Sequence, residues 1–364
     1  MATKPTVLIL GGTGFIGRNL VKYLVEGDFC SKIRVSDKNK PEMAYFHPKD
    51  QEIFANPVVE YVMSNLCNPA SVAKAFDLGG QGFDIVIDLA TVVPYGQDKE
   101  TYDQKLIQIA KVCGEEGKKT GIKRWIEVST AQVYNSNSKA SKETDKLKPW
   151  TSLAEAKLAA EKVLLDLKLP IIIVRPATVY GPGDVTGIMP RLVCGAVYVE
   201  LKEEMQFLWT AALQLNTVHV RDVCKALWFL TDHGEIGQIF NLADSAKTNQ
   251  GSINQLLGEI FHIKTGFAGA AKSNLARLKF KDIVNDVNET HLQPWGEITE
   301  KQGIKRTPLS PFLEPELLLN NDLAIDGTLI TTLGFTYDVP APTVDLLREE
   351  LQYWIDIQAF PPLP

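Results

Sequence analysis

The sequence has few cysteines and no cluster of them. The five cysteines are odd in number, lie far apart, and form neither a C-x-x-C pair nor a group with the five histidines. Disulfide frameworks and zinc sites are usually built from paired cysteines or from cysteines near histidines. We therefore expect no disulfide, no metal site, and a reducing, cytoplasmic location.

Long apolar runs and blocks of positive charge are also absent. No apolar run approaches the ~20 residues that a membrane helix needs, and because an apolar strand begins at Thr6 we expect no signal segment. The net charge is -6, and lysines cluster only in short pairs such as Lys118-Lys119. The composition thus favours neither a membrane nor a nucleic-acid partner. A small-molecule substrate or a nucleotide ligand is expected instead.

Continuous apolar segments alternate with amphipathic ones through the first half of the chain. Segments without polar alternation predict strands buried on both faces, at residues 6–10, 33–37, 59–66, 84–90, 125–130 and 171–177. Helical spacing of apolar residues predicts helices at residues 15–25, 70–76, 103–114 and 153–167. This alternation is typical of an α/β fold of the Rossmann type, with a doubly wound parallel sheet.

The regular alternation of apolar and amphipathic segments ends after Pro176. A strand and helix return at residues 217–230 and a further strand at 237–244, whereas the chain beyond Ser245 is irregular and rich in proline. We expect residues 1–180 and 213–244 to form a cofactor-binding domain. Residues 181–212 and 245–364 are expected to form a smaller C-terminal lobe, packed over the carboxyl edge of the sheet where open α/β folds bind ligands.

A glycine-rich turn joins the first predicted strand to the first helix. Gly11, Gly14 and Gly17 permit a tight turn, close approach of the backbone to a pyrophosphate, and close packing of helix on sheet. Asp37 ends the second strand, twenty residues beyond Gly17. A carboxylate there accepts hydrogen bonds from both ribose hydroxyls of NAD and repels the 2′-phosphate of NADP. NAD is therefore the expected cofactor.

Four residues in this half of the chain leave alternatives open. Lys38 and Lys40 would suit a phosphate, which keeps NADP as the less favoured cofactor. Asn65 ends the third strand and fits either a hydrogen bond to adenine or a turn. Asp88 lies in an apolar strand, where a structural hydrogen bond and a functional role are equally compatible with its position.

Segments spread along nearly the whole chain resemble the extended short-chain dehydrogenase/reductase family, which includes NAD-dependent epimerases, dehydratases and 3β-hydroxysteroid dehydrogenase-like proteins. They are "GGTGFIG" (11–17), "DLA" (88–90), "VSTAQVY" (128–134), "KLAAEK" (157–162), "RPATVYGPGD" (175–184), "VHVRDV" (218–223) and "LGF" (333–335). The resemblance implies a Ser or Thr that orients the substrate carbonyl. It also implies a Tyr that exchanges a proton with the substrate, and a Lys four residues on that holds the ribose and lowers the pKa of the Tyr.

By this resemblance the hydroxyl residue is Thr130 and the lysine is Lys157. The tyrosine position is Leu153, which has no proton to exchange, so the sequence indicates a modified catalytic site. Ser152 and Glu155 flank Leu153, but a neighbouring residue on a helix points about 100° away.

One residue outside this helix is a further candidate to replace the missing tyrosine. Tyr95 follows the fourth strand and either enters the site from the opposite wall or is an ordinary loop tyrosine. His219 is expected to be a buried, hydrogen-bonded structural histidine rather than a base.

The resemblance and the glycine turn together give a set of expected cofactor contacts. These are Gly11, Thr13, Gly14, Phe15, Ile16, Gly17, Asp37, Asn65, Leu66, Leu89, Ala90, Thr91, Lys157, Pro176 and Ala177. The expected catalytic residues are Thr130, Lys157 and Tyr95. The helices at 103–114 and 153–167 would form the interface of a homodimer, as is common in the family.

Two hypotheses for the function follow. The chain is an NAD-dependent epimerase/dehydratase or dehydrogenase-type oxidoreductase, acting on a sugar nucleotide or a hydroxylated small molecule. Alternatively, it is an inactive NAD-binding sensor or scaffold, which Leu153 favours.

Overall fold

The computed structural model describes residues 4–91, 94–269, 273 and 280–363. A seven-stranded sheet with the strand order β11-β7-β5-β4-β1-β2-β3 forms its centre, and all of the strand pairings in it are parallel. In chain order the strands are β1 (Thr6–Leu10), β2 (Lys32–Asp37), β3 (Val59–Met63), β4 (Ile85–Asp88), β5 (Arg124–Val128), β7 (Ile171–Pro176) and β11 (Ile239–Leu242). The predicted α/β fold of the Rossmann type is confirmed.

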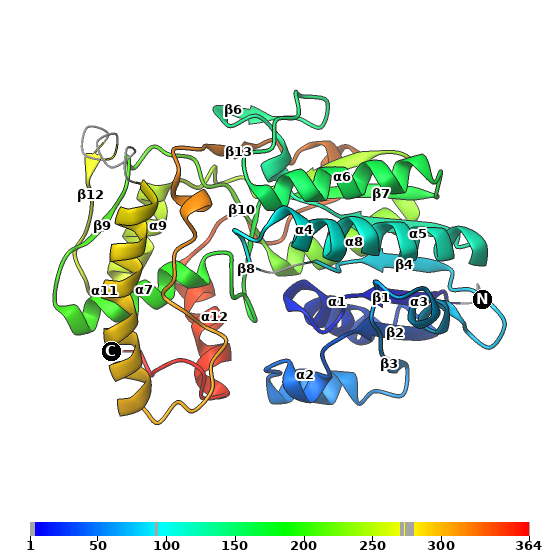
Figure 1. Ribbon diagram of the computed structural model, residues 1–364, viewed down its shortest axis with the longest axis horizontal. Coiled ribbons are helices and arrows are strands. Elements are labelled where there is room, and N and C mark those ends of the chain that lie inside the picture. Colours follow the sequence, from blue (N-terminus) through cyan, green and yellow to red (C-terminus); the bar gives the residue numbers. More distant parts are fainter. Residues whose placement is uncertain (1–3, 92–93, 270–272, 274–279, 364) are drawn as a thin grey trace.

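Helices cover both faces of this sheet (Figure 1). One face carries α1 (Phe15–Glu26) and α8 (Val220–His233), with α2 (Pro48–Phe54) beside α1. The other carries α3 (Pro69–Phe76), α5 (Gln108–Thr120) and α6 (Ser152–Asp166). Successive strand residues alternate between the two cores, as Val7 and Leu8 do in β1. Burial on both faces explains why these strands lack polar alternation.

One predicted helix differs from the observed one at both ends. The prediction placed it at residues 103–114, whereas α4 (Lys99–Tyr102) and a π-helical turn (Asp103–Ile107) precede α5, which ends at Thr120. Gly121 then follows in the left-handed conformation, with φ of 69°. A glycine after the last turn is a usual helix stop.

A C-terminal lobe lies beside the carboxyl end of the sheet (Figure 1). Its core is formed by α7 (Met189–Leu201), α9 (Gln250–Phe261), α11 (Phe280–Lys301) and α12 (Val344–Asp356). Short strand pairs complete it, β9 (Met205–Phe207) with β12 (Thr265–Phe267) and β8 (Thr178–Tyr180) with β10 (Thr217–His219). The chain thus leaves the sheet after β7 and returns to it through α8 and β11.

Part of the predicted lobe range packs on the sheet domain instead. β13 (Leu323–Ile325) pairs with β6 (Asn137–Ser141), and the short helix η6 (Leu329–Leu333) follows it. Ile330 and Phe335 belong to the same apolar core as β1 and α8. The Asp222 carboxylate in α8 accepts hydrogen bonds from the backbone N–H groups of Asp338 and Val339, at 2.8 and 2.9 Å. Residues 323–339 therefore connect the lobe to the sheet domain by packing on it.

His219 is the structural residue that the sequence predicts. Its side chain is fully buried, and Nδ1 accepts a hydrogen bond from the backbone N–H of Arg221 at 3.2 Å, which caps α8. Nε2 has no hydrogen-bond partner among the residues that the structure describes. Burial, together with the nearby charge of Arg221, lowers the pKa of His219 to about 4.

This lowered pKa predicts a loss of stability in acid. The folded state favours neutral His219, so its contribution is present above the usual pKa of 6.5 and is lost as the pH falls through about 4. The total loss is about 3 kcal/mol, at about 1.4 kcal/mol per pKa unit. His219→Asn retains the cap without a titrating group. The free energy of unfolding of the wild type, relative to that of the variant, should therefore fall by about this amount between pH 7 and pH 4. Urea unfolding at both pH values measures it, and a difference that does not change with pH would contradict this account.

Candidate cofactor and catalytic site

The glycine turn leaves the N-terminus of α1 open. Gly14 precedes α1, is exposed, and provides no side-chain cap, and the first turn of the helix carries no acidic residue. A Cβ added to Gly17 would lie 2.5 Å from the Cα atom of Gly12, so the helix packs directly on the turn. The free N–H groups and positive end of the helix dipole are suited to an anion such as a pyrophosphate.

Gly11 brings the turn against the end of β4. It adopts a φ of 72°, and a Cβ there would lie 2.9 Å from the Cα atom of Ala90. Leu89 and Ala90 are half-buried at this point, and Thr91 is exposed. The structure thus places these three predicted contact residues beside the glycine turn, at the carboxyl edge of the sheet.

Asp37 keeps its carboxylate next to the turn. Oδ2 accepts a hydrogen bond from the backbone N–H of Thr13 at 3.2 Å, and Oδ1 accepts one from that of Asn39 at 3.0 Å. Lys38 and Lys40 are exposed, and no ion pair joins either of them to Asp37 within the described part of the chain. Each carboxylate oxygen has a second lone pair, so the group can still accept from two ribose hydroxyls.

Asn65 uses its side chain locally. Its Oδ1 accepts a hydrogen bond from the backbone N–H of Cys67 at 3.1 Å, while its own N–H donates to Ser71 Oγ at 3.0 Å. Leu66 is buried in the core beside α3 and α5. The turn role of Asn65 is therefore present, and its amide nitrogen stays at the exposed edge after β3.

Lys157 forms the centre of a buried charge cluster. Its Nζ donates to the backbone carbonyl of Val128 at 2.9 Å, and the side chain is almost fully buried. Burial raises the pKa of Asp88 to about 6, and the ammonium of Lys157 opposes this rise. Burial and repulsion from Asp88 raise the pKa of Glu127 well above its usual range, again opposed by Lys157. Lys157 therefore ties α6 to the ends of β4 and β5.

A hydrogen-bonded chain runs from Thr130 to Tyr95. Thr130 Oγ1 accepts from the backbone N–H of Gln132 at 3.2 Å, and Gln132 Nε2 donates to the Tyr95 hydroxyl at 3.1 Å. Gln132 Oε1 accepts from Thr151 Oγ1 at 2.9 Å, and Thr151 caps α6 by accepting from the backbone N–H of Ala154. The chain thus links Tyr95 to the start of α6.

Leu153 lies in the first turn of α6 and packs in an apolar cluster. Its neighbours there are Tyr102, Leu106 and Ala156, and Tyr95 packs against the same cluster. Tyr95 therefore lies between Leu153 and Gln132, which brings a phenol next to the position where the family resemblance expects one. Burial raises the pKa of Tyr95 to about 12, so its hydroxyl is protonated at neutral pH.

Glu316 from the lobe covers the start of α6. Its carboxylate accepts from the backbone N–H of Ser152 at 3.0 Å and from Ser152 Oγ at 2.5 Å. Glu316 belongs to the short helix η5 (Pro315–Leu318). Ser152, one of the flanking residues considered in the sequence, is thus engaged by the lobe.

Pro176 and Ala177 lie at the end of β7, where both are buried. The backbone N–H of Ala177 donates to the carbonyl of Leu242 at 2.8 Å. Phe15 and Ile16 begin α1 and are partly buried against the sheet core. All of these predicted contacts lie on the carboxyl side of the sheet, together with the glycine turn.

Residues 7–243 match the sequence model of the NAD dependent epimerase/dehydratase family, and the chain therefore belongs to this family. The expected resemblance to extended short-chain dehydrogenases/reductases is confirmed. The predicted cofactor, NAD, is the one in the family's description. No described helix has the length and apolar character needed to cross a membrane.

Curated relatives carry different activities. The chain is 26% identical over 216 residues to the mouse (Mus musculus) protein "Sterol-4-alpha-carboxylate 3-dehydrogenase, decarboxylating". This match covers 57% of this chain and 53% of that protein. It is 26% identical over 261 residues to the dTDP-D-glucose 4,6-dehydratase of Dictyostelium discoideum, covering 65% and 57%. The aligned region thus spans little more than half the length of these two relatives.

Solved structures share the fold over almost the whole chain. The dTDP-glucose 4,6-dehydratase from Streptomyces venezuelae with NAD bound has a TM-score of 0.68 at 18% identity, covering 96% of this chain and 97% of that one. The UDP-glucuronic acid 4-epimerase from Bacillus cereus, in complex with UDP-glucuronic acid and NAD, has a TM-score of 0.69 at 17% identity, covering 96% and 98%.

Sequence reasoning missed two residues of this site. Gln132 lies within "VSTAQVY", but nothing in the pattern shows that its amide bridges Tyr95 and Thr151. Glu316 comes from the irregular proline-rich segment, 164 residues from its partner Ser152. Such a contact depends on how the lobe packs, and local sequence patterns do not encode it.

The contact between Gly11 and Ala90 predicts a specific sensitivity to substitution. Gly11→Ala would place Cβ against backbone atoms at 2.9 Å, whereas Gly121→Ala has a similar φ of 69° and no neighbour within 4 Å. Gly121→Ala should lower the free energy of unfolding by about 1–2 kcal/mol through the left-handed conformation alone. Gly11→Ala should lower it by about 1–3 kcal/mol more through overpacking. Urea unfolding of both variants measures this, and equal losses would show that the turn and β4 are not in close contact.

Proposed function

We propose that this chain binds NAD at the glycine turn and catalyses an oxidoreductase-type reaction on a small molecule with a hydroxyl or carbonyl group. The observation that carries the proposal is that the open α1 N-terminus, the Asp37 carboxylate and Lys157 all lie at the carboxyl edge of the sheet. The solved relatives that hold NAD support the same assignment. When bound, NAD supplies or accepts the hydride.

Lys157 and Thr130 retain the roles that the family resemblance gives them. The Lys157 ammonium has three protons, and the Val128 carbonyl accepts only one of them. The others can donate to ribose hydroxyls. Thr130 is half-buried and already accepts a hydrogen bond from Gln132, so its own proton is available to orient a substrate oxygen.

Tyr95 is proposed to supply the proton that Leu153 cannot. Its oxygen accepts from Gln132, so its own hydrogen is free to donate, and its raised pKa keeps that proton in place at neutral pH. In the reducing direction, hydride adds to the carbonyl carbon while the Tyr95 proton moves to the carbonyl oxygen, which gives an alcohol. Because Tyr95 is protonated at neutral pH, it can act as the acid in reduction, whereas it would first have to lose its proton to act as the base in oxidation.

The substrate class follows from the relatives only in outline. Sugar nucleotides and hydroxylated small molecules both occur among them, as in the dehydratase, the epimerase and the sterol dehydrogenase. We propose a substrate with a carbonyl or secondary alcohol that reaches Tyr95 and Thr130 from the lobe side.

A second function is favoured by one observation. Leu153 is buried in an apolar cluster and offers no proton, which fits a module that binds NAD without turnover and acts as a sensor or scaffold. The two proposals share the cofactor site and differ in whether Tyr95 exchanges a proton.

Tyr95→Phe is the test that separates them. NADH oxidation is followed by absorbance against a panel of ketones, steroids and sugar nucleotides, at neutral pH. We expect wild-type turnover of at least one substrate and a loss of about 10²- to 10⁴-fold in Tyr95→Phe, the usual contribution of general acid catalysis. NADH binding should be unchanged, because Tyr95 is assigned to the substrate.

Leu153→Tyr and Leu153→Phe form a matched control pair. Both introduce a ring of similar size, and only the first adds a hydroxyl. If wild type and Tyr95→Phe turn over a substrate equally, the chain is an enzyme but Tyr95 is not its proton donor. If wild type turns over no substrate and only Leu153→Tyr is active, the binding module is the better account.

A further inference from the structure

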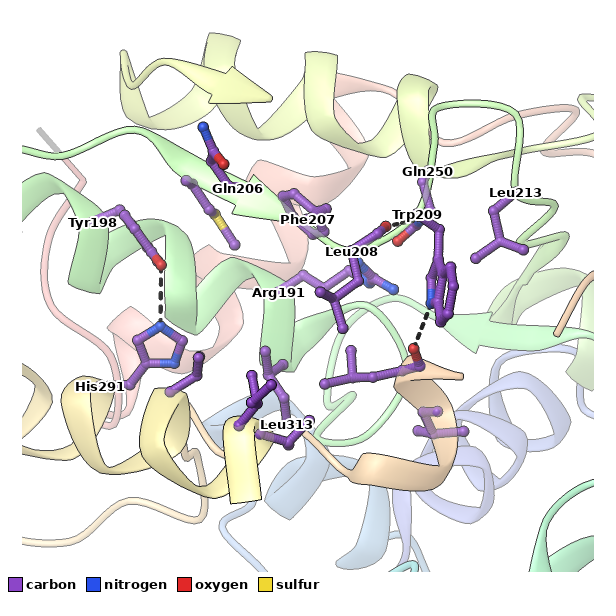
Figure 2. Close-up of a pocket in the computed structure, with 16 residues that line it drawn as sticks. Arg191, Tyr198, Gln206, Phe207, Leu208, Trp209, Leu213, Gln250, His291 and Leu313 are labelled. Carbon is purple, nitrogen blue, oxygen red and sulfur yellow. Dashed lines mark hydrogen bonds between the residues drawn. The ribbon is translucent and has the colours of Figure 1, made fainter. Parts of the chain in front are cut away.

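A pocket in the C-terminal lobe is lined almost entirely by apolar side chains. It has a volume of about 740 Å³ including its open mouth, and it lies between α7, β9 with the residues that follow it, α11, and the segment 313–318. Figure 2 shows its lining residues, with Phe207, Leu208 and Trp209 on one side and Leu313 on the other. We call it the Arg191 pocket after the single cation among its described lining residues.

Most polar groups of the Arg191 pocket are already satisfied by one another. Trp209 Nε1 donates to the carbonyl of Leu318 at 2.7 Å, and Gln250 Nε2 donates to that of Leu208 at 3.0 Å. The His291 ring lies 3.4 Å from the Tyr198 hydroxyl, and burial lowers the pKa of His291, which keeps it neutral at pH 7. These groups line the pocket but leave few unsatisfied hydrogen-bond donors or acceptors for a ligand.

Arg191 is the exception. Its guanidinium lies 5.1 Å from the centroid of the Phe207 ring, and within the described part of the chain it has no hydrogen bond and no ion pair. The Arg191 side chain is half-buried and lines the pocket. Burial lowers the pKa of Arg191 to about 10, so the group stays charged at neutral pH. No carboxylate is present among the described lining residues to balance this charge.

We propose that the Arg191 pocket binds an amphipathic anion, with an apolar body against the aromatic and aliphatic walls and one carboxylate, or similar anionic group, on Arg191. A guanidinium with five donors matches the two oxygens of such a group. A sugar nucleotide carries two phosphates and a sugar covered with hydroxyls, and this pocket offers one cation and few free polar groups. The chemistry of the walls thus favours an apolar ligand with a single charge.

The pocket adjoins the candidate catalytic site through one segment of chain. Leu313, Leu317 and Leu318 line the pocket, while Glu316 between them holds Ser152 at the start of α6. The pocket wall is therefore connected, through Glu316, to the first turn of α6. That a ligand of this pocket is the substrate rests on the proposed function, whereas its binding does not.

Binding is tested with two fluorescent probes that share an aromatic body, anilinonaphthalene sulfonate and the uncharged phenylnaphthylamine. Both are titrated into the full chain without NAD, so a failure of NAD binding or turnover does not affect the result. Arg191→Met should weaken sulfonate binding roughly 10- to 100-fold, as expected for loss of a charge-assisted contact, and leave the uncharged probe unchanged. Arg306→Met is the matched control, because Arg306 also lies over an aromatic ring, that of Tyr45, and does not line the pocket.

Competition and stability give independent readouts. Decanoate should displace the sulfonate probe more effectively than decanol, and UDP-glucose should not displace it. Because an unpaired cation is removed from a partly buried position, Arg191→Met should raise the urea midpoint of the ligand-free protein. The proposal is overturned if Arg191→Met weakens both probes equally, if it weakens neither, or if UDP-glucose displaces the sulfonate and decanoate does not.

Discussion

The Lys157 ammonium, held among two acidic side chains and a backbone carbonyl, is the interaction on which the rest of the site depends. It neutralises part of the repulsion between Asp88 and Glu127 and donates to Val128. Three buried ionisable groups are tolerated only when they compensate one another. This places the first turn of α6 beside the ends of β4 and β5, and so positions both the cap at Thr151 and the leucine that follows it.

Helix α6, which Lys157 holds in place, is connected to two other parts of the site. Thr151 and Gln132 connect α6 to Tyr95, and Glu316 connects α6 to the lobe. The loop after β4 thus places the Tyr95 phenol beside the apolar cluster that holds Leu153, which is the basis for proposing Tyr95 as the proton donor. The segment that carries Glu316 also lines the pocket around Arg191, so the lobe contacts the start of α6 and walls the pocket with the same residues.

The sheet and the glycine turn were predictable because their signals are local. Close backbone packing requires glycine at two positions of the turn, as the contacts of Gly11 with Ala90 and of Gly17 with Gly12 show. Tyr95 was predicted from its place after a strand, but its packing against the apolar cluster that holds Leu153 could not be inferred from the sequence. The contacts of Glu316 and Gln132 and the burial of Arg191 depend on how distant segments pack. The irregular lobe has no periodic pattern from which this packing could be inferred.

The most direct test of the central claim is an NADH fluorescence titration of the wild-type chain, repeated with NADPH and with Asp37→Asn. Micromolar binding of NADH, clearly tighter than that of NADPH, with the preference reduced in Asp37→Asn, is the result that this account predicts. The repulsion between the Asp37 carboxylate and a 2′-phosphate is its physical basis. If neither nucleotide binds, the glycine turn serves only the fold, and the assignment of Tyr95 and Lys157 to chemistry at a bound cofactor is wrong.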